Sequence, residues 1–332
     1  MATYKEIKGT QIQAVATDPS NPVEGQVWYN TTSNVLKGSK GALIASWSSV
    51  NSINSQRYYL AGAGTQTAAL GFGGRPPSGT PSGGNFSAQT ESWNGTNWTE
   101  VNDLNNSRQA VSGAGASNTA ALCFGGNPAP PNPKAHTELW NGTNWTEVNN
   151  LNTGREIAAG GGTSTAALMY GGTTQTAAAA NNESWNGTNW TELADLNTAR
   201  YFIAGSVSST SLALGFGGEN PPNKGITESW NGSSWTEVND LNSARIAMAI
   251  GACGTAPAAL AIGGNDGSIT GKTELWNGSN WSEQNDLNTA RTTAGCAGAP
   301  TAALAFGGNE PPQSTAAEAW TEAGGVVTFT DS

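Results

Sequence analysis

The amino-acid sequence predicts an all-β propeller of six four-stranded blades, and three recurring landmarks carry that prediction. An arginine, a Gly-Gly pair and a hairpin with two tryptophans return about every 44 to 52 residues along the chain, a repeat length typical of propellers and other arrays. Each repeat has room for four short strands separated by turns, which is the content of a propeller blade.

The composition agrees with this fold class and argues against some classes of binding partner. Charged residues make up 11% of the 332-residue chain, whereas glycine and small polar residues dominate, which favours short strands and turns over long amphipathic helices. The 14 basic and 24 acidic side chains give a formal net charge of −10. Binding to nucleic acid draws on clustered lysine and arginine, so no nucleic-acid partner is expected, and acidic substrates are disfavoured as well.

Neither a metal site nor a cofactor is expected. The three cysteines, Cys123, Cys253 and Cys296, lack the spacing of a metal knuckle or a disulfide framework, and we expect buried thiols. The first residues, MATYKEIKGTQIQ, lack the apolar core of a secretion signal, so export by that route is not expected. The most apolar stretch, residues 244–264, is interrupted by glycine, threonine and proline, and no membrane insertion is expected.

Residues 1–46 stand outside the repeats, and we predict that they form an attachment segment. Within them, residues 18–25 (DPSNPVEG) indicate a turn, and residues 26–38 (QVWYNTTSNVLKG) indicate a short hairpin. The propeller is expected over residues 47–323, followed by a C-terminal tail over residues 324–332.

The landmarks occur six times each, although the last tryptophan hairpin is degraded. The arginines are Arg57, Arg108, Arg155, Arg200, Arg245 and Arg291. The Gly-Gly pairs begin at Gly73, Gly125, Gly171, Gly217, Gly263 and Gly307. The hairpins of the type WNGTNW begin at Trp93, Trp140, Trp185, Trp230 and Trp276, with a remnant at Trp320. Their second tryptophans are Trp98, Trp145, Trp190, Trp235 and Trp281. An Asn-Gly pair between two strands is the sign of a tight hairpin.

The repeat that follows Arg200 illustrates the four predicted strands. They cover Phe202 to Val207, Ser211 to Gly217, Thr227 to Trp230, and Trp235 to Leu241. The first strand is rich in small residues, which suits the crowded centre of a propeller.

The start of the repeat region is predicted to complete the last blade. Trp47 precedes Arg57 by ten residues (57 − 47), the interval that also separates Trp98 from Arg108 (108 − 98). Residues 47–57 therefore indicate a fourth strand without its first three, whereas the last repeat lacks a fourth strand after Trp320. We expect residues 47–53 to pair beside Trp320 and close the ring, because closure removes exposed sheet edges.

The order of these landmarks resembles the kelch repeat. The arginine, the small first strand, the apolar second strand ending in Gly-Gly, the aromatic third strand and the Trp-x-x-aliphatic-x-x-aliphatic fourth strand all follow that pattern from Trp47 to Thr321. Trp-Asn-Gly stands where kelch repeats usually have Tyr-Asp. The resemblance implies a six-bladed kelch-like β-propeller closed by its N-terminal strand.

Residues 18–38 (DPSNPVEGQVWYNTTSNVLKG) are similar to segments near the starts of bacteriophage tail and virion proteins. Arrays rich in Thr, Asn and Gly of this style also resemble those of phages that infect marine bacteria. The resemblance implies a non-enzymatic structural or adhesive protein of the phage particle, assembled in the bacterial host cytoplasm: a tail fibre, a tail-tip component or a capsid decoration. Residues 1–46 would dock onto other virion proteins, and the propeller would contact a bacterial surface glycan or protein.

The loops between second and third strands vary in length and content, unlike the fixed WNGTNW turns. Loops held by a rigid scaffold are common binding sites, although tolerated insertions at exposed tips are the alternative interpretation. In a propeller these loops would share one face with the connections between blades. The candidate binding residues are Arg75, Pro76, Phe86, Asn127, Pro130, Lys134, His136, Glu219, Asn220, Lys224, Asp266, Lys272 and Glu310.

The repeated arginines and tryptophans are interpreted as structural. A group present once in every blade suits a bracing contact better than catalysis, and glutamates recur at Glu91, Glu138, Glu183, Glu228 and Glu274 as possible ion-pair partners. The second tryptophans, together with Trp47, are expected to pack between or within blades, with a sugar-stacking platform as the alternative.

Enzymatic activity is not expected. His136 is the sole histidine in the sequence, which argues against a copper radical oxidase and against a Ser-His-Asp hydrolase. The turn SWNGTNW is similar to the Asp-box of sialidases but has Asn in place of Asp and is one residue shorter. Two alternatives remain open: a cellular kelch-type protein-interaction scaffold, and a glycan-cleaving enzyme with acidic groups at the central mouth that are not repeated in every blade.

Overall fold

The computed structural model describes residues 12–19, 26–39, 45–77, 86–128, 135–174, 177–251, 253–310, 313–322 and 326–329. These residues form two compact units: a large one, Ser46–Thr321, and a small one that combines Met1–Ala45 with Glu322–Ser332. The described residues contain strands but no helix, so they include no helical segment of the length and apolarity needed to cross a membrane. The protein is all-β, as predicted.

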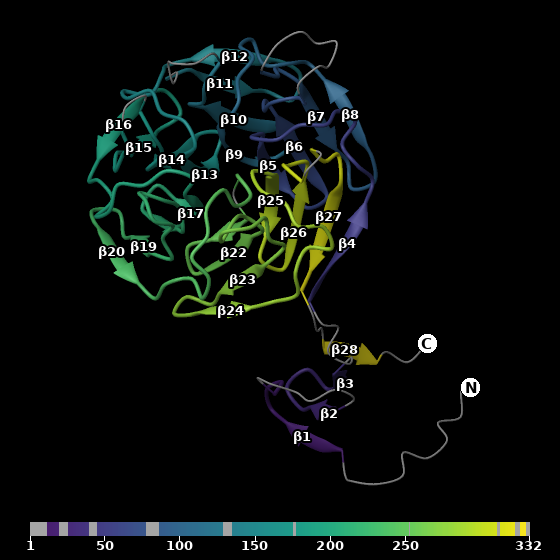
Figure 1. Cartoon of the computed structure of the whole chain (residues 1–332). Helices are drawn as coiled ribbons and strands as arrows, with labels where there is room; N and C mark the ends of the chain where they lie inside the picture. Colours follow the sequence, from purple (N-terminus) through teal and green to yellow (C-terminus); the bar gives the residue numbers. More distant parts are fainter. Residues whose placement is uncertain are drawn as a thin grey trace. The chain divides into compact units, whose positions relative to one another are not determined.

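Six four-stranded antiparallel sheets build the large unit, and each is a propeller blade (Figure 1). The first strands are β5 (Ala61–Thr65), β9 (Ser112–Ser117), β13 (Ala159–Thr163), β17 (Ala204–Ser209), β21 (Gly254–Thr255) and β25 (Gly295–Ala299). The second strands are β6 (Ala68–Phe72), β10 (Ala120–Phe124), β14 (Ala166–Tyr170), β18 (Leu212–Phe216), β22 (Ala258–Ile262) and β26 (Ala302–Phe306). We number the blades one to six in this order.

The third and fourth strands form the outer hairpin of each blade. The third strands are β7 (Thr90–Trp93), β11 (Thr137–Trp140), β15 (Asn182–Trp185), β19 (Thr227–Trp230), β23 (Thr273–Trp276) and β27 (Ala317–Thr321). The fourth strands are β8 (Trp98–Val101), β12 (Trp145–Val148), β16 (Trp190–Leu193), β20 (Trp235–Val238), β24 (Trp281–Glu283) and β4 (Ser46–Val50). The two tryptophans of each hairpin lie directly opposite each other, as Trp93 and Trp98 do.

The first strands surround the centre and complete a ring. Each contacts the next in the order β5, β9, β13, β17, β21 and β25, and β25 contacts β5 again (Figure 1). Their small residues permit this close approach: a Cβ atom on Gly62 of blade one would lie 2.2 Å from the Cys296 carbonyl oxygen of blade six. The prediction that small first strands occupy the crowded centre is therefore confirmed.

Strand β4 closes the ring by completing blade six. It pairs antiparallel with β27, and Trp47 lies opposite Trp320, with 5.4 Å between the ring centroids. The Trp47 indole Nε1 also donates a hydrogen bond to the Thr273 hydroxyl of blade five at 3.0 Å. The predicted pairing is confirmed, although the strand ends at Val50 rather than Ile53.

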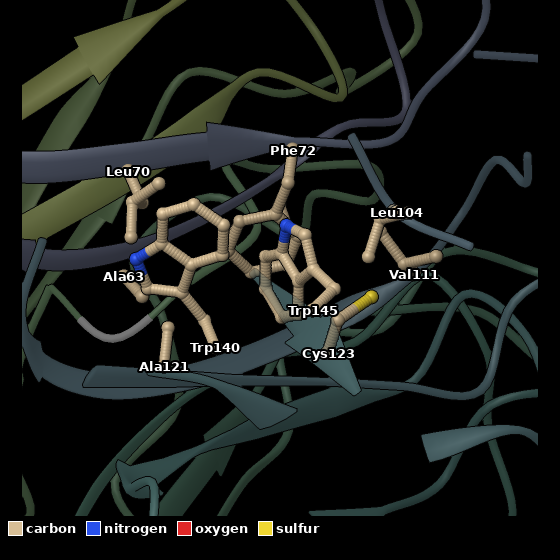
Figure 2. Close-up of a cluster of buried hydrophobic side chains, with 10 residues drawn as sticks. Ala63, Leu70, Phe72, Leu104, Val111, Ala121, Cys123, Trp140 and Trp145 are labelled. Atoms are coloured by element: carbon tan, nitrogen blue, oxygen red, sulfur yellow. The ribbon is translucent and has the colours of Figure 1, made fainter. Parts of the chain in front are cut away.

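Aromatic side chains fill the spaces between neighbouring blades. In the cluster of Figure 2, Trp145 of blade two lies edge-on against Phe72 of blade one, with ring centroids 5.1 Å apart. Cys123 contributes to the same cluster, and the two other cysteines are also buried with free thiols. Equivalent contacts join Phe124 to Trp190 and Phe216 to Trp281. The fourth-strand tryptophans thus attach each blade to the blade before it.

A hydrogen bond accompanies most of these contacts. Indole Nε1 atoms of fourth-strand tryptophans donate to third-strand threonines of the preceding blade at 3.0 Å: Trp47 to Thr273, Trp145 to Thr90, Trp190 to Thr137, and Trp281 to Thr227. Trp98 and Trp235 have no such acceptor, and their buried Nε1 atoms are unpaired. The corresponding residue is threonine in four blades, but it is Ala317 in blade six, which precedes Trp98, and Asn182 in blade three, which precedes Trp235.

Replacing Ala317 with threonine is expected to stabilise the propeller by about 0.5–1.5 kcal/mol, because the new hydroxyl would accept the buried Trp98 Nε1 hydrogen. The reverse change, Thr137→Ala, removes the acceptor of Trp190 and should cost about 1–3 kcal/mol. Thermal unfolding of the two variants and the unchanged chain measures both effects. Equal or lower stability of Ala317→Thr would contradict the assignment.

The small unit contains a sheet in the order β1 (Gln13–Val15), β2 (Val27–Asn30), β3 (Val35–Ser39) and β28 (Val326–Phe329). Strands β2 and β3 form the predicted hairpin, whereas residues 20–25 of the predicted turn lie outside the described residues. The residues expected to be a separate tail contain β28, which pairs with β3. The sequence analysis did not anticipate this pairing.

Asp18 organises the small unit. Its carboxylate accepts hydrogen bonds from Lys37 Nζ at 2.7 Å, Asn30 Nδ2 at 2.7 Å and the buried Trp28 Nε1 at 3.0 Å. The hydrogen bond from Lys37, followed by those from Asn30 and Trp28, lowers the pKa of Asp18 from 3.8 to about 2. The ionised carboxylate therefore favours the folded unit above pH 4, and this contribution disappears as the pH falls toward 2.

Acidification from pH 4 to pH 2 is expected to loosen the small unit, and the Asp18→Asn variant is expected to lack this pH dependence because it has no carboxylate to protonate. The Trp28 indole Nε1–H resonance in a proton–nitrogen NMR spectrum reports on the contact directly. The same titration of this resonance in Asp18→Asn would show that another group is responsible.

Candidate functional site

The six repeated arginines are buried and brace the connections between blades. Arg57, in the connection from β4 to β5, donates from Nη2 to the Glu91 carboxylate at 2.7 Å and from Nη1 to the carbonyl oxygens of Gly73 and Gln89. The corresponding pairs are Arg108 with Glu138, Arg155 with Glu183, Arg200 with Glu228, Arg245 with Glu274, and Arg291 with Glu318. None of these guanidinium groups is exposed to a ligand.

The second oxygen of each glutamate holds an asparagine in the same connection. Glu91 accepts hydrogen bonds from the Asn54 backbone N–H at 2.6 Å and from Asn54 Nδ2 at 2.8 Å, and Nδ2 also donates to the Trp98 carbonyl. The arginine and asparagine together attach the incoming connection to the second, third and fourth strands of its blade. These repeated charges therefore fix the scaffold from which the variable residues project.

The two residues after each arginine form the mouth of the propeller. The second of them donates its backbone N–H to the carbonyl oxygen of its counterpart in the preceding blade, over distances from 2.7 to 3.3 Å. This hydrogen-bonded ring runs through Tyr59, Ala110, Ile157, Phe202, Ala247 and Thr293 and returns to Tyr59. We call these six residues the mouth ring.

Every residue of the mouth ring has a left-handed backbone conformation, with φ between +48° and +56°. Such angles are unfavourable for bulky and β-branched residues, and here the ring of hydrogen bonds holds them. This conformation also corrects the predicted start of the first strand: Phe202 belongs to the mouth ring, and β17 begins at Ala204. The backbone hydrogen bonds of the mouth ring therefore fix the positions from which its six side chains project.

Four aromatic rings form a row across the mouth. Tyr58 and Tyr59 of blade one lie 5.1 Å apart, Tyr59 and Phe202 lie 6.2 Å apart, and Phe202 and Tyr201 of blade four lie 5.5 Å apart, all between ring centroids. Blades one and four are opposite members of the six-blade ring. The row of Tyr58, Tyr59, Phe202 and Tyr201, here named the aromatic row, therefore spans the opening.

Charged and amide groups flank the aromatic row. Arg75 places its guanidinium carbon 6.0 Å from the centre of the Tyr58 ring. At the other end, a hydrogen bond to the Glu219 carboxylate raises the pKa of Tyr201. Burial raises the pKa of Glu156 despite a hydrogen bond from Asn127 Nδ2 at 3.3 Å. Burial likewise raises the pKa of Tyr59, with smaller effects of Tyr58, Glu156 and Arg75, so these polar groups lie within electrostatic reach of the row.

A small apolar cavity borders the mouth ring. Its lining includes Ile157, Phe202 and Ala247 of the ring, together with Met248 and Ile250. The side chains that line it are apolar, so this cavity offers apolar contact rather than a buried polar site.

The structure brings together three of the thirteen candidate loop residues at the mouth. Arg75, Asn127 and Glu219 each pair through the backbone with the first residue after an arginine: Tyr58, Gln109 and Tyr201. The remaining described candidates lie farther along the loops: Pro76, Phe86, His136, Asn220, Lys224, Asp266, Lys272 and Glu310. Pro130 and Lys134 lie outside the described residues.

Several of those remaining loop residues already form ion pairs or hydrogen bonds with nearby residues. Asp266 and Lys272 form an ion pair at 2.8 Å, and the Asn220 amide donates to the Ala199 carbonyl at 3.2 Å. The His136 carbonyl accepts a hydrogen bond from Arg108. Among the described residues, no group of three or more His, Cys, Asp or Glu side chains is arranged to hold a metal ion.

The chain enters and leaves the propeller at the face opposite the mouth. In blade one, Phe72 pairs with Ala61 and Thr90 at the mouth end, whereas Ala69 pairs with Trp93 beside the fixed WNGTNW turn. Blade six has no such turn: Thr321 at the end of β27 pairs with Ser46 at the start of β4. Ser46 and Thr321, the first and last residues of the propeller, therefore lie at its fixed-turn face.

The fold is a β-propeller, and a row of four aromatic side chains crosses its mouth. No protein-family model matches the sequence, and no curated protein matches it. Solved structures do match: one, a structure of YjhT, aligns with a TM-score of 0.64 over 84% of this chain and 99% of that chain. The sequence identity is 12%, so the likeness shows the propeller fold alone.

The sequence analysis missed the aromatic row, although a signal was present. The positions directly after each invariant arginine differ between blades: Tyr-Tyr, Gln-Ala, Glu-Ile, Tyr-Phe, Ile-Ala and Thr-Thr. These variable residues lie beside an invariant arginine, so the fold fixes their backbone positions but does not require one type of side chain there.

Proposed function

We propose that this chain is a non-enzymatic structural and adhesive protein of a bacteriophage particle, built on a kelch-like propeller. The proposal rests on the difference between the two opposite faces of the propeller. Ser46 and Thr321, the two ends of the propeller, lie on the fixed-turn face, and the mouth with its variable loops occupies the other. A propeller with both chain ends on one face and variable loops on the other suits attachment to a particle and contact with a host surface.

The phage assignment is supported by the similarity of residues 18–38 to segments of tail and virion proteins. In this proposal the small unit docks onto other virion proteins, and the particle is assembled in the bacterial host cytoplasm. The docking unit includes β28 as well as the N-terminal segment, because β28 pairs with β3. A tail fibre, a tail-tip component and a capsid decoration all fit this arrangement.

Mass spectrometry of purified, nuclease-treated phage particles tests the proposal, with separated capsid and tail fractions. The expected result is stoichiometric recovery of the chain in one fraction. A chain found in lysates but absent from gradient-purified particles would overturn the virion assignment.

One observation favours a glycan-cleaving enzyme as a second candidate. Glu156 and Glu219 lie at the mouth and are not repeated in the other blades. Cleavage of a glycosidic bond requires a pair of carboxyl groups on either side of it. Product analysis after prolonged incubation with bacterial surface polysaccharide distinguishes the candidates: products that disappear in both Glu156→Gln and Glu219→Gln would establish the enzyme.

A further inference from the structure

The aromatic row is a stepped platform of four rings, tilted within each blade and nearly parallel across the mouth. The planes of Tyr59 and Phe202 are within 22° of parallel, and their centroids are 6.2 Å apart. This separation exceeds the roughly 3.5–4.0 Å of direct carbon–carbon contact, and the two rings within each blade are tilted against each other by 40° (Tyr58 and Tyr59) and 48° (Tyr201 and Phe202). All four rings of the row are partly exposed. The row therefore offers successive apolar surfaces from blade one to blade four.

The backbone holds this platform in place before any ligand binds. The mouth ring fixes the Cα atoms of Tyr59 and Phe202 through backbone hydrogen bonds to their neighbours. The adjacent Tyr58 and Tyr201 are paired through their backbones with Arg75 and Glu219. Rigid aromatic side chains on a fixed backbone lose little conformational entropy on binding, which favours affinity.

The surrounding groups favour a neutral ligand. Arg75 lies by Tyr58, Glu219 bonds to Tyr201 and Glu156 accepts from Asn127, so each charge at the row already has a local contact. One cation beside two carboxylates gives no excess of positive charge for an anionic ligand. The carboxylates and amides provide hydrogen-bond acceptors and donors for hydroxyl groups at the edges of the row.

The shape of the mouth favours a saccharide over a peptide. Peptide recognition depends on anchor side chains inserted into well-packed pockets. The cavity that borders the mouth ring is small and apolar, so it offers no deep pocket for an anchor side chain. Pyranose rings instead present flat C–H faces that lie on aromatic rings, with hydroxyl groups around their edges.

We propose that the aromatic row binds a neutral, linear oligosaccharide whose successive sugar rings stack on Tyr58, Tyr59, Phe202 and Tyr201. The inference rests on the proposed adhesive function and names the chemical class of its ligand. Arg75 and Glu219 mark the two ends of the binding site. Affinity is set by the number of aromatic rings that the saccharide covers.

Isothermal titration of the full chain with cello-oligosaccharides of one to six glucose units tests the proposal. Affinity is expected to rise at least tenfold from the disaccharide to the tetrasaccharide and then level off, because the row contains four rings. Oligogalacturonides of equal length, which are anionic, and a neutral Gly-Ser hexapeptide should bind at least tenfold more weakly than the tetrasaccharide.

Variants connect the binding to the row. Phe202→Leu keeps an apolar side chain over the cavity but removes the aromatic face, and it should lower affinity for the tetrasaccharide at least tenfold. Phe202→Tyr should restore the affinity to within threefold. Tyr29→Leu is the matched control, because Tyr29 is an exposed tyrosine of the small unit. This variant should bind the tetrasaccharide with unchanged affinity. Melting temperatures of all variants report on folding.

Absence of binding to the neutral series at millimolar concentration, affinity independent of length, or unchanged affinity of folded Phe202→Leu would each overturn the proposal. Tighter binding of the peptide would assign the mouth to a protein partner instead. These results would not by themselves refute the proposed function. If purified particles contain the chain and host cells bind it, the adhesive function holds and its ligand is a different molecule.

Discussion

Replacement of Arg155 with methionine is expected to lower the free energy of unfolding of the propeller by about 3–5 kcal/mol, because it leaves the buried Glu183 charge without its partner. The Arg155 side chain is fully buried and lies 2.9 Å from the Glu183 carboxylate. It also donates to the carbonyl oxygens of Gly171 and Asn181, which would lose a hydrogen-bond partner in the protein interior. The loss therefore exceeds that of an ordinary ion pair.

Lys272→Met provides the matched control. Lys272 forms an ion pair with Asp266 at a similar distance of 2.8 Å, but both side chains are partly exposed. Water screens the exposed pair, so this variant should lose less than about 1 kcal/mol. Urea unfolding followed by tryptophan fluorescence measures both changes. Similar losses in the two variants would refute the bracing role of the buried arginines.

Replacement of Trp47 with alanine is expected to cost about 3–5 kcal/mol and to open blade six selectively. Trp47 packs on Trp320 and donates to Thr273, and its strand comes from the opposite end of the chain. No tight turn joins β27 to β4, so loss of side-chain packing allows the strands to separate with a large gain in chain entropy. Backbone amides of β27 and β4 should then exchange with deuterium faster than amides of the other blades.

Trp190→Ala is the control for this experiment. Trp190 occupies the same position in blade three and donates to Thr137, but a short hairpin joins its strand to β15. The variant should lose similar stability without selective exchange in blade six. Selective opening of blade six in both variants, or in neither, would contradict the closing role of β4.

The repeated parts of the fold were predictable because they obey a fixed spacing. The interval from Trp47 to Arg57 matched that from Trp98 to Arg108, and it identified the strand that completes blade six. The Asn-Gly pair placed Trp93 and Trp98 on opposite strands of one hairpin. The hairpin contact is local, whereas the pairing of Trp47 with Trp320 joins distant segments and was predictable because the repeat left one fourth strand over at the start and one missing at the end.

The mouth and the small unit were less predictable because their contacts depend on the closed ring or on distant segments. Nothing near Tyr59 in the sequence indicates that it lies beside Phe202, since six blades must first close to bring them together. Phe202 appeared to belong to a strand, but its hydrogen bonds to neighbouring blades impose a left-handed conformation. Strand β28 is short and pairs with a segment almost the whole chain length away.

The most direct test of the account compares the two propeller faces in binding to bacterial host cells. Cysteine is introduced either at Asn220, on the mouth-face loop of blade four, or at Thr96, in the fixed turn of blade one, and each is coupled to polyethylene glycol. Both positions are exposed, and the three native cysteines are buried. We expect the polymer at position 220 to abolish cell binding measured by flow cytometry and the polymer at position 96 to leave it intact. Loss of binding with the polymer at position 96, together with binding retained at position 220, would contradict this expectation.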